Sequence, residues 1–205
     1  MPLVYQQNIN AESKLAVWHI TEEADFFLKE VPLQKEISHP HKRLQHLAGR
    51  YLLKELYPSF PLELIQIADT RKPYLATEAF HFSISHCGDY AAALVSKTHR
   101  VGVDIETVRE KIGSIVPKFM SPAELTILPI AGNDKLATLC WSIKESIYKW
   151  QGNLGVDFKR DIKIEKILGD EMAGEIHCIY QSKMPLSLHY LYFNNQYLAW
   201  LLTNH

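Results

Sequence analysis

Two acidic residues, Asp104 and Glu106, flank Ile105 in the apolar run that begins Val101-Gly102-Val103. If this run is a β-strand, alternate residues share a face, so the two carboxylates project in the same direction. Two anions on one face repel each other and resist the loss of their water. Because a bound divalent cation is the simplest relief of that repulsion, the pair predicts a metal site.

A third carboxylate would improve such a site, since Mg²⁺ prefers octahedral coordination by oxygen atoms of carboxylates, water and substrate phosphates. Glu145 is the natural candidate because it lies in the strongest helical pattern of the chain, residues 134–151. On that helix Trp141, Glu145 and Lys149 follow one another at a spacing of four. A Glu-to-Lys pair at this spacing is ordinarily a surface ion pair worth ~0.2–0.5 kcal/mol, but the neighbouring tryptophan favours the edge of a groove.

Cationic side chains gather on the helix expected at residues 38–56. Lys42, Arg43, His46 and Arg50 occupy much of its polar side, and they are either a solvated face or an anion-binding face. Gly49, inside the same helix, costs about 1 kcal/mol relative to alanine, so we expect close packing there.

Two polar turns offer further groups that a phosphate could use. The turn at residues 69–74 contains Arg71 and Lys72 before a proline, and it is either an ordinary surface turn or a phosphate contact. The corner at residues 85–89 joins two β-type runs into a hairpin. Its imidazole, His86, is by itself more often structural than a ligand.

Composition limits the functions that are open to this chain. Its 205 residues are 47% hydrophobic and carry a formal net charge of -1, which is typical of a globular protein and argues against a nucleic-acid binder. Three widely spaced cysteines without a Cys-x-x-Cys pair argue against a zinc site or a disulfide framework. We expect neither a signal peptide nor a membrane-spanning helix, because no apolar run approaches the ~18 residues that a span requires.

The order of patterns predicts an α+β fold. We expect strands near 15–20, 64–68, 80–85, 90–96 and repeatedly from 162 onward, and helices near 21–31, 38–56, 109–119 and 134–151. Thr21 is expected to cap the first of these helices, and Ser121-Pro122-Ala123-Glu124 has the pattern of a capping box. The series of strand, helices and strands occurs twice, which predicts two similar halves, residues 1–100 and 101–205.

Three blocks, read in order, resemble one enzyme family. They are Phe82-Ser83-Ile84-Ser85-His86, Val101-Gly102-Val103-Asp104-Ile105-Glu106 and the run from Trp141 to Lys149. Together with Arg71-Lys72-Pro73, they are similar to the 4'-phosphopantetheinyl transferases, of the longer, pseudo-dimeric kind that activates nonribosomal peptide and polyketide synthetases. The chain departs from the family pattern at Ser83, where asparagine is usual, and at Arg71, where glycine is usual.

The resemblance implies an enzyme that transfers the phosphopantetheine arm of coenzyme A to a serine of an apo acyl or peptidyl carrier protein, releasing 3',5'-ADP. It also implies an antiparallel sheet packed on a long helix in each half, with a pseudo-two-fold relation between the halves. The first half would bind the coenzyme A nucleotide. The second half would hold the metal and dock the carrier, near residues 152–158. A monomer in the cytoplasm is the expected form, and neither a membrane nor a nucleic acid is an expected partner.

By the same resemblance each candidate residue acquires a role. Asp104, Glu106 and Glu145 would hold Mg²⁺, and Lys149 would approach the leaving phosphate. The residues expected to hold the nucleotide are Arg43, Lys72, Ser85 and His86. The base that deprotonates the carrier serine would be Glu145, Glu124 or a metal-bound water, with Glu124 ranked last because the capping box already explains it.

Two other functions remain open from the sequence. One is a different Mg²⁺-dependent phosphohydrolase or nuclease that uses the same three acids. The other is a catalytically inactive module that binds carrier proteins. The carrier protein and its pathway are not specified by the sequence.

Overall fold

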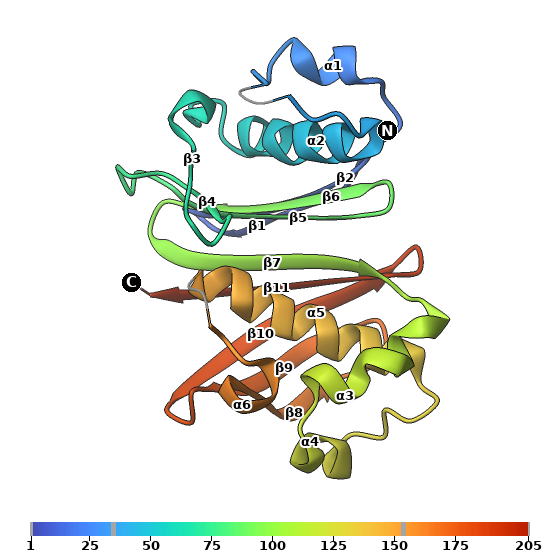
Figure 1. Cartoon of the computed structure of the whole chain (residues 1–205). Coiled ribbons are helices and arrows are strands. Elements are labelled where there is room, and N and C mark those ends of the chain that lie inside the picture. Colours follow the sequence, from blue (N-terminus) through green and yellow to red (C-terminus); the bar gives the residue numbers. More distant parts are fainter. Residues whose placement is uncertain (1, 34–35, 153–154, 205) are drawn as a thin grey trace. The chain divides into compact units, whose positions relative to one another are not determined.

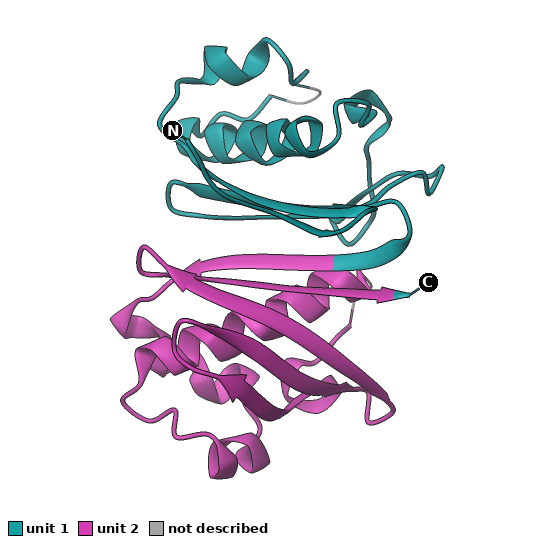
Figure 2. Cartoon of the chain, turned by 180° about the vertical axis from the view of Figure 1, so that it is seen from behind, with its two compact units in different colours: residues 1–101, 204–205 teal, residues 102–203 magenta. Residues whose placement is uncertain are grey.

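The chain folds into two compact units, each built around its own sheet. The computed structural model describes residues 2–33, 36–152 and 155–204. The first unit comprises residues 1–101 and 204–205, and the second comprises residues 102–203 (Figure 2). The boundary falls inside a strand, β7 (His99–Thr107).

The first unit contains a four-stranded antiparallel sheet in the order β1-β2-β6-β5, with the long helix α2 against it (Figure 1). Its strands are β1 (Leu3–Asn10), β2 (Ser13–His19), β5 (His81–Cys87) and β6 (Tyr90–Ser96). Its helices are α1 (Ala24–Leu28), α2 (Pro40–Leu56) and the short 3₁₀ turn η1 (Leu62–Leu64). A small ribbon of β3 (Gln66–Ile67) and β4 (Pro73–Tyr74) completes it.

Close approach between α2 and the sheet explains the glycine in the middle of that helix. A Cβ atom on Gly49 would lie only 2.6 Å from Cγ2 of Ile84 on β5. The close packing expected at this glycine is therefore confirmed. Leu47, Ala48 and Leu52 form the buried side of the helix and join the core of the first unit.

The second unit contains a five-stranded sheet in the order β7-β11-β10-β9-β8, with α5 (Asp134–Gln151) as its long helix. The other strands are β8 (Ile162–Gly169), β9 (Ala173–Tyr180), β10 (Met184–Phe193) and β11 (Gln196–Asn204). Shorter helical segments are η2 (Glu110–Ile115), α3 (Val116–Phe119), α4 (Pro122–Ile127) and α6 (Phe158–Asp161). Ile143 and Ile147 of α5 pack with the sheet residues Ile162, Leu188 and Leu201 in one core.

The expected α+β class with antiparallel sheets is confirmed, as are the hairpin of β5 and β6, the helix at 134–151 and the capping box at Ser121. The two-fold relation between the halves stays a prediction. Thr21 is not a cap, because α1 begins at Ala24 with Glu23 at its N-cap position. The turn between β9 and β10 lies at residues 181–183, where Gln181 and Ser182 have positive φ, and β10 begins at Met184.

Other differences follow from weak local signals. Strand β1 was not expected, because its run Leu3–Asn10 is largely polar and lies at one edge of the sheet. The segment 109–119 was expected as one helix and divides into η2 and α3. Pro117 accounts for the division, since a proline is tolerated in the first turn of a helix but not in its interior.

All three cysteines are buried, and the described residues contain no disulfide. Burial raises the pKa of Cys140 to about 12 and the pKa of Cys178 further in the same direction. Among the helices of the described residues, none combines the length and the apolar character that a bilayer crossing requires.

Candidate functional site

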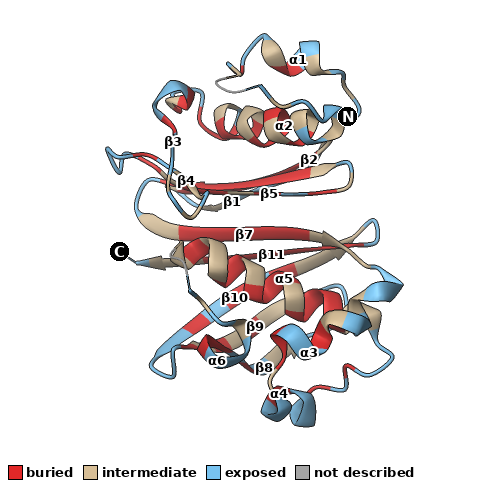
Figure 3. Cartoon of the chain, in the orientation of Figure 1, coloured by how far each residue is buried: buried red, intermediate tan, exposed pale blue. Residues whose placement is uncertain are grey.

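The acid pair lies on β7, the strand whose central residues are all buried (Figure 3). Asp104 is 2% exposed and Glu106 is half-buried. Gly102 brings this strand against α5, since a Cβ atom there would collide with the carbonyl oxygen of Ser146 and would lie 2.7 Å from Cβ of Trp150. The strand that carries the acids is therefore held directly beside the helix that carries Glu145.

Lys149 of α5 contacts the acid pair through Asp104. Its Nζ atom donates a hydrogen bond to Oδ1 of Asp104 over 2.6 Å, and the lysine side chain is 25% exposed. Glu145 lies one helical turn before Lys149, so both side chains project from the same ridge of α5.

The pKa of Glu145 shows the effect of the other charges in the cluster. Its pKa is raised to about 7, first by burial, then by repulsion from Asp104 and, more weakly, from Glu106, while Lys149 opposes the shift. The structure thus brings together four of the residues expected to do chemistry: Asp104, Glu106, Glu145 and Lys149. All four belong to the second unit.

The chemical character of this cluster fits Mg²⁺. Carboxylate oxygens are the ligands that this hard cation prefers, and the repulsion that raises the pKa of Glu145 is what a divalent cation would relieve. This chemical fit does not mean that the side chains already form a metal site. Within residues 2–33, 36–152 and 155–204, no three His, Cys, Asp or Glu side chains converge in the geometry of a metal site.

His86 lines a cavity of about 540 Å³. Lys42, His46 and Arg50, spaced by four residues on α2, line the same cavity, and so does Arg71. Whether this face binds an anion stays a prediction. The sequence analysis named His46 and Arg50 on a cationic helix face and Arg71 in a cationic turn, but it assigned none of the three to the nucleotide. The four-residue spacing was the signal that connects the helix residues.

His46 is neutral in this cavity at ordinary pH. Its pKa is lowered to about 4, first by burial and then by the nearby charges of Arg50 and His86. A neutral ring can accept a hydrogen bond, and Nη1 of Arg50 lies 3.1 Å from Nδ1 of His46. The second ring nitrogen then carries the proton and remains a hydrogen-bond donor.

Lys72 lines a separate cavity of about 240 Å³ together with His81 and Arg100. Burial and the neighbouring charge of Arg100 lower the pKa of Lys72 to about 8. Pro73 lines both this cavity and the one that contains His86. Lys72 and His86 thus line two different cavities, which have Pro73 in common.

The other two predicted nucleotide residues lie apart from the cavity of His86. Ser85 is 4% exposed and precedes His86 in β5, so the two side chains project from opposite faces of the strand. Arg43 lines a third cavity, of about 270 Å³, beside Glu23 and Ser38. Because it follows Lys42 directly, Arg43 is rotated away from the Lys42–His46–Arg50 face of α2.

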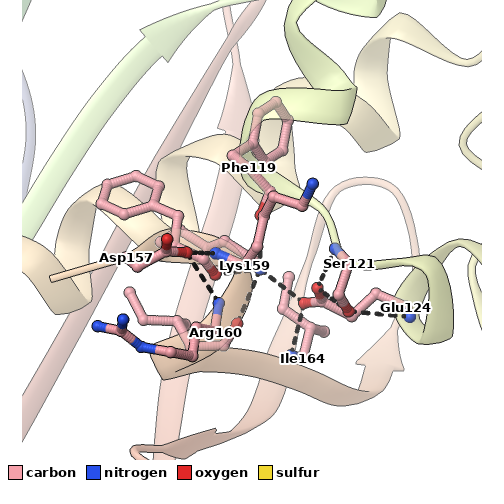
Figure 4. A network of polar contacts seen from close by, with 10 residues as sticks. Phe119, Ser121, Glu124, Asp157, Lys159, Arg160 and Ile164 are labelled. Carbon is pink, nitrogen blue, oxygen red and sulfur yellow. Dashed lines mark hydrogen bonds and ion pairs between the residues drawn. The ribbon is translucent and has the colours of Figure 1, made fainter.

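Glu124 has a complete set of partners inside the second unit (Figure 4). Its Oε2 atom accepts from the backbone N–H and the hydroxyl of Ser121, at 2.8 and 2.7 Å. Its Oε1 atom accepts from the backbone N–H of Ile164 at 2.9 Å and lies 2.7 Å from Nζ of Lys144. Glu124 is 2% exposed, so this carboxylate acts as a buried structural acceptor.

An aromatic cavity of about 390 Å³ lies near the segment expected to dock the carrier. Phe119, Trp141 and Phe158 line it, with ring centroids 5.1 and 5.6 Å apart in successive pairs. Lys118 and Asp157 add charged groups of both signs to its border. Residues 153–154 of the expected docking segment 152–158 lie outside the described residues.

A family model described as "4'-phosphopantetheinyl transferase superfamily" matches residues 100–199. Enterobactin synthase component D of Escherichia coli (strain K12) is 36% identical over 121 residues, which is 53% of this chain and 54% of that protein. A putative 4'-phosphopantetheinyl transferase of Haemophilus influenzae is 30% identical over 121 residues, 56% of this chain and 52% of that protein. 4'-Phosphopantetheinyl transferase AcpT of Escherichia coli O157:H7 is 30% identical over 126 residues, 58% of this chain and 64% of that protein.

The chain thus spans about half the length of the curated relatives that it matches. The family match covers β7 and α5, which carry the four clustered residues. Both the geometry and the comparisons therefore point to one likeness: residues 100–199, which hold the acid cluster, are similar to the 4'-phosphopantetheinyl transferase superfamily.

Proposed function

We propose that this protein transfers the 4'-phosphopantetheine arm of coenzyme A to a serine of an apo acyl or peptidyl carrier protein. The observation that carries the proposal is the gathering of Asp104, Glu106, Glu145 and Lys149 in the part of the chain that the family model matches. Phosphoryl transfer depends mainly on positioning and on neutralising charge, and a cluster of acids beside a lysine supplies both.

The step requires no nucleophile on the enzyme. The serine oxygen of the carrier attacks the phosphorus that bears the pantetheine arm, a new P–O bond forms, and the bond to the bridging oxygen breaks. The leaving group is 3',5'-ADP. We assign Glu145 to accept the serine proton, and Lys149 to contact the leaving phosphate and supply its proton. Glu124 is not assigned this role, because its oxygens already serve Ser121, Lys144 and Ile164.

We assign Asp104, Glu106 and Glu145 to hold Mg²⁺. When bound, the metal would neutralise negative charge that develops on the pyrophosphate. Lys149, which contacts Asp104 in this structure, would then be released toward the phosphate that leaves.

The nucleotide end of coenzyme A fits the cavity that His86 lines. Lys42, Arg50 and Arg71 provide positive charge there, and Ile37 and Ile84 provide apolar surface for a purine ring. We place the ribose 3'-phosphate among these cations. Lys72 borders the neighbouring cavity, and we assign it to the same nucleotide.

The carrier would dock on the second unit, where the aromatic cavity provides a recess for an apolar side chain. We also propose that the enzyme works as a monomer in the cytoplasm.

A labelling experiment tests the proposed function. The protein is incubated with several apo carrier proteins, a fluorescent coenzyme A and Mg²⁺, and transfer is read as label on the carrier. Label is expected on the carrier and not on a version that lacks the acceptor serine, and EDTA should abolish it.

Variants define the site more sharply. Asp104→Asn should abolish labelling, whereas Glu165→Gln, which changes an exposed acid of the same unit, should not. If coenzyme A is hydrolysed without a carrier, the protein is instead an Mg²⁺-dependent phosphohydrolase. If carriers bind but no carrier is labelled and no coenzyme A is consumed, it is an inactive carrier-binding module.

A further inference from the structure

The turn between β3 and β4 holds Arg71 in an unusual backbone conformation. Its φ angle is +64°, in the left-handed region that non-glycine residues rarely occupy. The turn is closed by hydrogen bonds from the N–H of Ala68 to the carbonyl of Lys72 (3.0 Å) and from the N–H of Arg71 to the carbonyl of Ala68 (2.8 Å). The hydrogen bonds of the turn therefore impose this backbone conformation, which arginine itself does not favour.

Glycine is the residue that such a position favours, because it lacks the Cβ atom that crowds the following carbonyl. Arginine retains no conformational advantage here, so a reason for its presence is expected in its side chain. Backbone strain of this kind motivates a functional hypothesis when the side chain reaches a site.

Arg71, which is exposed, lines the cavity of about 540 Å³ that contains Lys42, His46, Arg50 and His86. These four residues come from α2 and β5, whereas Arg71 comes from the turn, so it closes the ring of cationic and imidazole groups from a different element. Charges in the cavity act on one another, as the lowered pKa of His46 shows. Adding another cation to this ring is unfavourable unless an anion binds there.

We propose that Arg71 is a specificity-determining residue that reads the 3'-phosphate of coenzyme A and so discriminates against 3'-dephospho-coenzyme A. The inference rests on the proposed function, because it takes the cavity to be the site of the coenzyme A nucleotide. A 3'-phosphate carries nearly two negative charges at neutral pH, and a planar guanidinium pairs with it through two parallel hydrogen bonds. The ring hydroxyl of the dephospho compound offers no such charge.

Direct binding measurements test this without any carrier protein. Calorimetric titration with coenzyme A and with 3'-dephospho-coenzyme A is done on the wild-type protein, Arg71→Asn, Arg71→Gly and Arg71→Lys. Asparagine and glycine both accept the left-handed backbone, so the midpoint of thermal unfolding should be no lower than that of the wild type. Both variants should bind coenzyme A about 10- to 100-fold more weakly, while their affinity for the dephospho compound changes less than about twofold. Arg71→Lys should recover part of the loss.

A charge-matched control separates local recognition from general electrostatics. Lys29→Ala removes an exposed cation of the same unit that does not line the cavity, and it should leave the preference for coenzyme A unchanged. The proposed role of Arg71 is overturned if Arg71→Asn loses affinity for both compounds by the same factor. It is also overturned if the variant binds both compounds as tightly as the wild type does.

The two proposals fail in different ways. If the wild-type protein prefers coenzyme A through Arg71 but labels no carrier, the inference about Arg71 holds and the proposed function is wrong. If the wild-type protein labels carriers but Arg71→Asn keeps the full preference for coenzyme A, the proposed function holds and the inference about Arg71 is wrong.

Discussion

The Nζ atom of Lys144 lies 2.7 Å from Oε1 of Glu124, and the two side chains are 0% and 3% exposed. The same ammonium group donates to the carbonyl oxygens of Phe119 and Phe158, both at 2.9 Å, and of Ile162 at 2.8 Å. The pair thus joins α5 to the end of α3 and to the starts of α6 and β8. Burial lowers the pKa of Lys144, and the adjacent carboxylate opposes that shift.

Removing one member of this pair should be strongly destabilising. Lys144→Met leaves a buried carboxylate without its cation, which typically costs about 3–5 kcal/mol. Combining it with Glu124→Gln should cost less than the sum of the two single changes, with a coupling of about 1–3 kcal/mol. Urea unfolding of the four proteins measures the coupling. Lys135→Met, which removes the exposed partner of Glu171, should change the free energy of unfolding far less than Lys144→Met does, because solvent screens an exposed ion pair. Additive costs would contradict the coupling of the buried pair.

Gly102 should be intolerant of even one added carbon. In Gly102→Ala, the new Cβ atom would meet the Ser146 carbonyl and would lie 2.9 Å from Cδ2 of Leu201. We expect a loss of stability of roughly 1–3 kcal/mol from overpacking, together with loss of transfer, because β7 must move relative to α5. Chemical denaturation and the labelling assay measure the two effects. Gly113→Ala is the matched control, since the nearest atom to its Cβ lies 3.9 Å away. A stable and active Gly102→Ala protein would show that β7 can shift without harm.

The lowered pKa of His46 predicts a specific dependence of stability on pH. The pKa is about 4 in the folded chain and 6.5 in the unfolded reference, so the unfolded state binds more protons between these values. Stability from this group is therefore present above pH 6.5 and is lost as the pH falls toward 4. In His46→Gln, the free energy of unfolding should fall less across this interval than in the wild type. Parallel pH curves for the two proteins would exclude a buried neutral imidazole at this position.

Magnesium should stabilise the protein even without coenzyme A or a carrier. If Mg²⁺ binds the folded acid cluster, a concentration 100 times the dissociation constant adds about 2.7 kcal/mol to the free energy of unfolding. The midpoint of thermal unfolding should rise on addition of Mg²⁺ and return on addition of EDTA. Asp104→Asn should remove this response, and Glu165→Gln should retain it. A metal-dependent rise of equal size in Asp104→Asn would remove Asp104 from the proposed ligands.

The sequence predicted the strongly periodic elements well, because their signals are local. The helix at 134–151 has a polar cap, an uninterrupted apolar stripe and glycine at its end, so its bounds were predicted correctly. The hairpin of β5 and β6 alternates clearly around a short polar corner. Strand β1 has no such signal, because its polar edge sequence shows no buried face. Its pairing with β2 stabilises the strand instead.

The acid cluster was also accessible from spacing alone, since alternation in β7 and a four-residue repeat in α5 define which side chains share a face. The nucleotide residues were harder to predict. Which of Lys42 and Arg43 reaches the cavity of His86 depends on the rotation of α2 about its axis, and Gly49 against Ile84 determines that rotation. The separation of Ser85 from His86 follows from their being consecutive in a strand, which a motif read as one block conceals.

The buried cysteines can report on the unfolding of each unit separately. A thiol reacts with an alkylating reagent as the thiolate, and burial suppresses the thiolate in both Cys140 and Cys178. Cys87 lies in the first unit, and the other two lie in the second. Brief exposure to an alkylating reagent in rising denaturant, followed by mass spectrometry of peptides, would therefore reveal whether the two units open together or one before the other. The natural sequence permits this without any engineered probe.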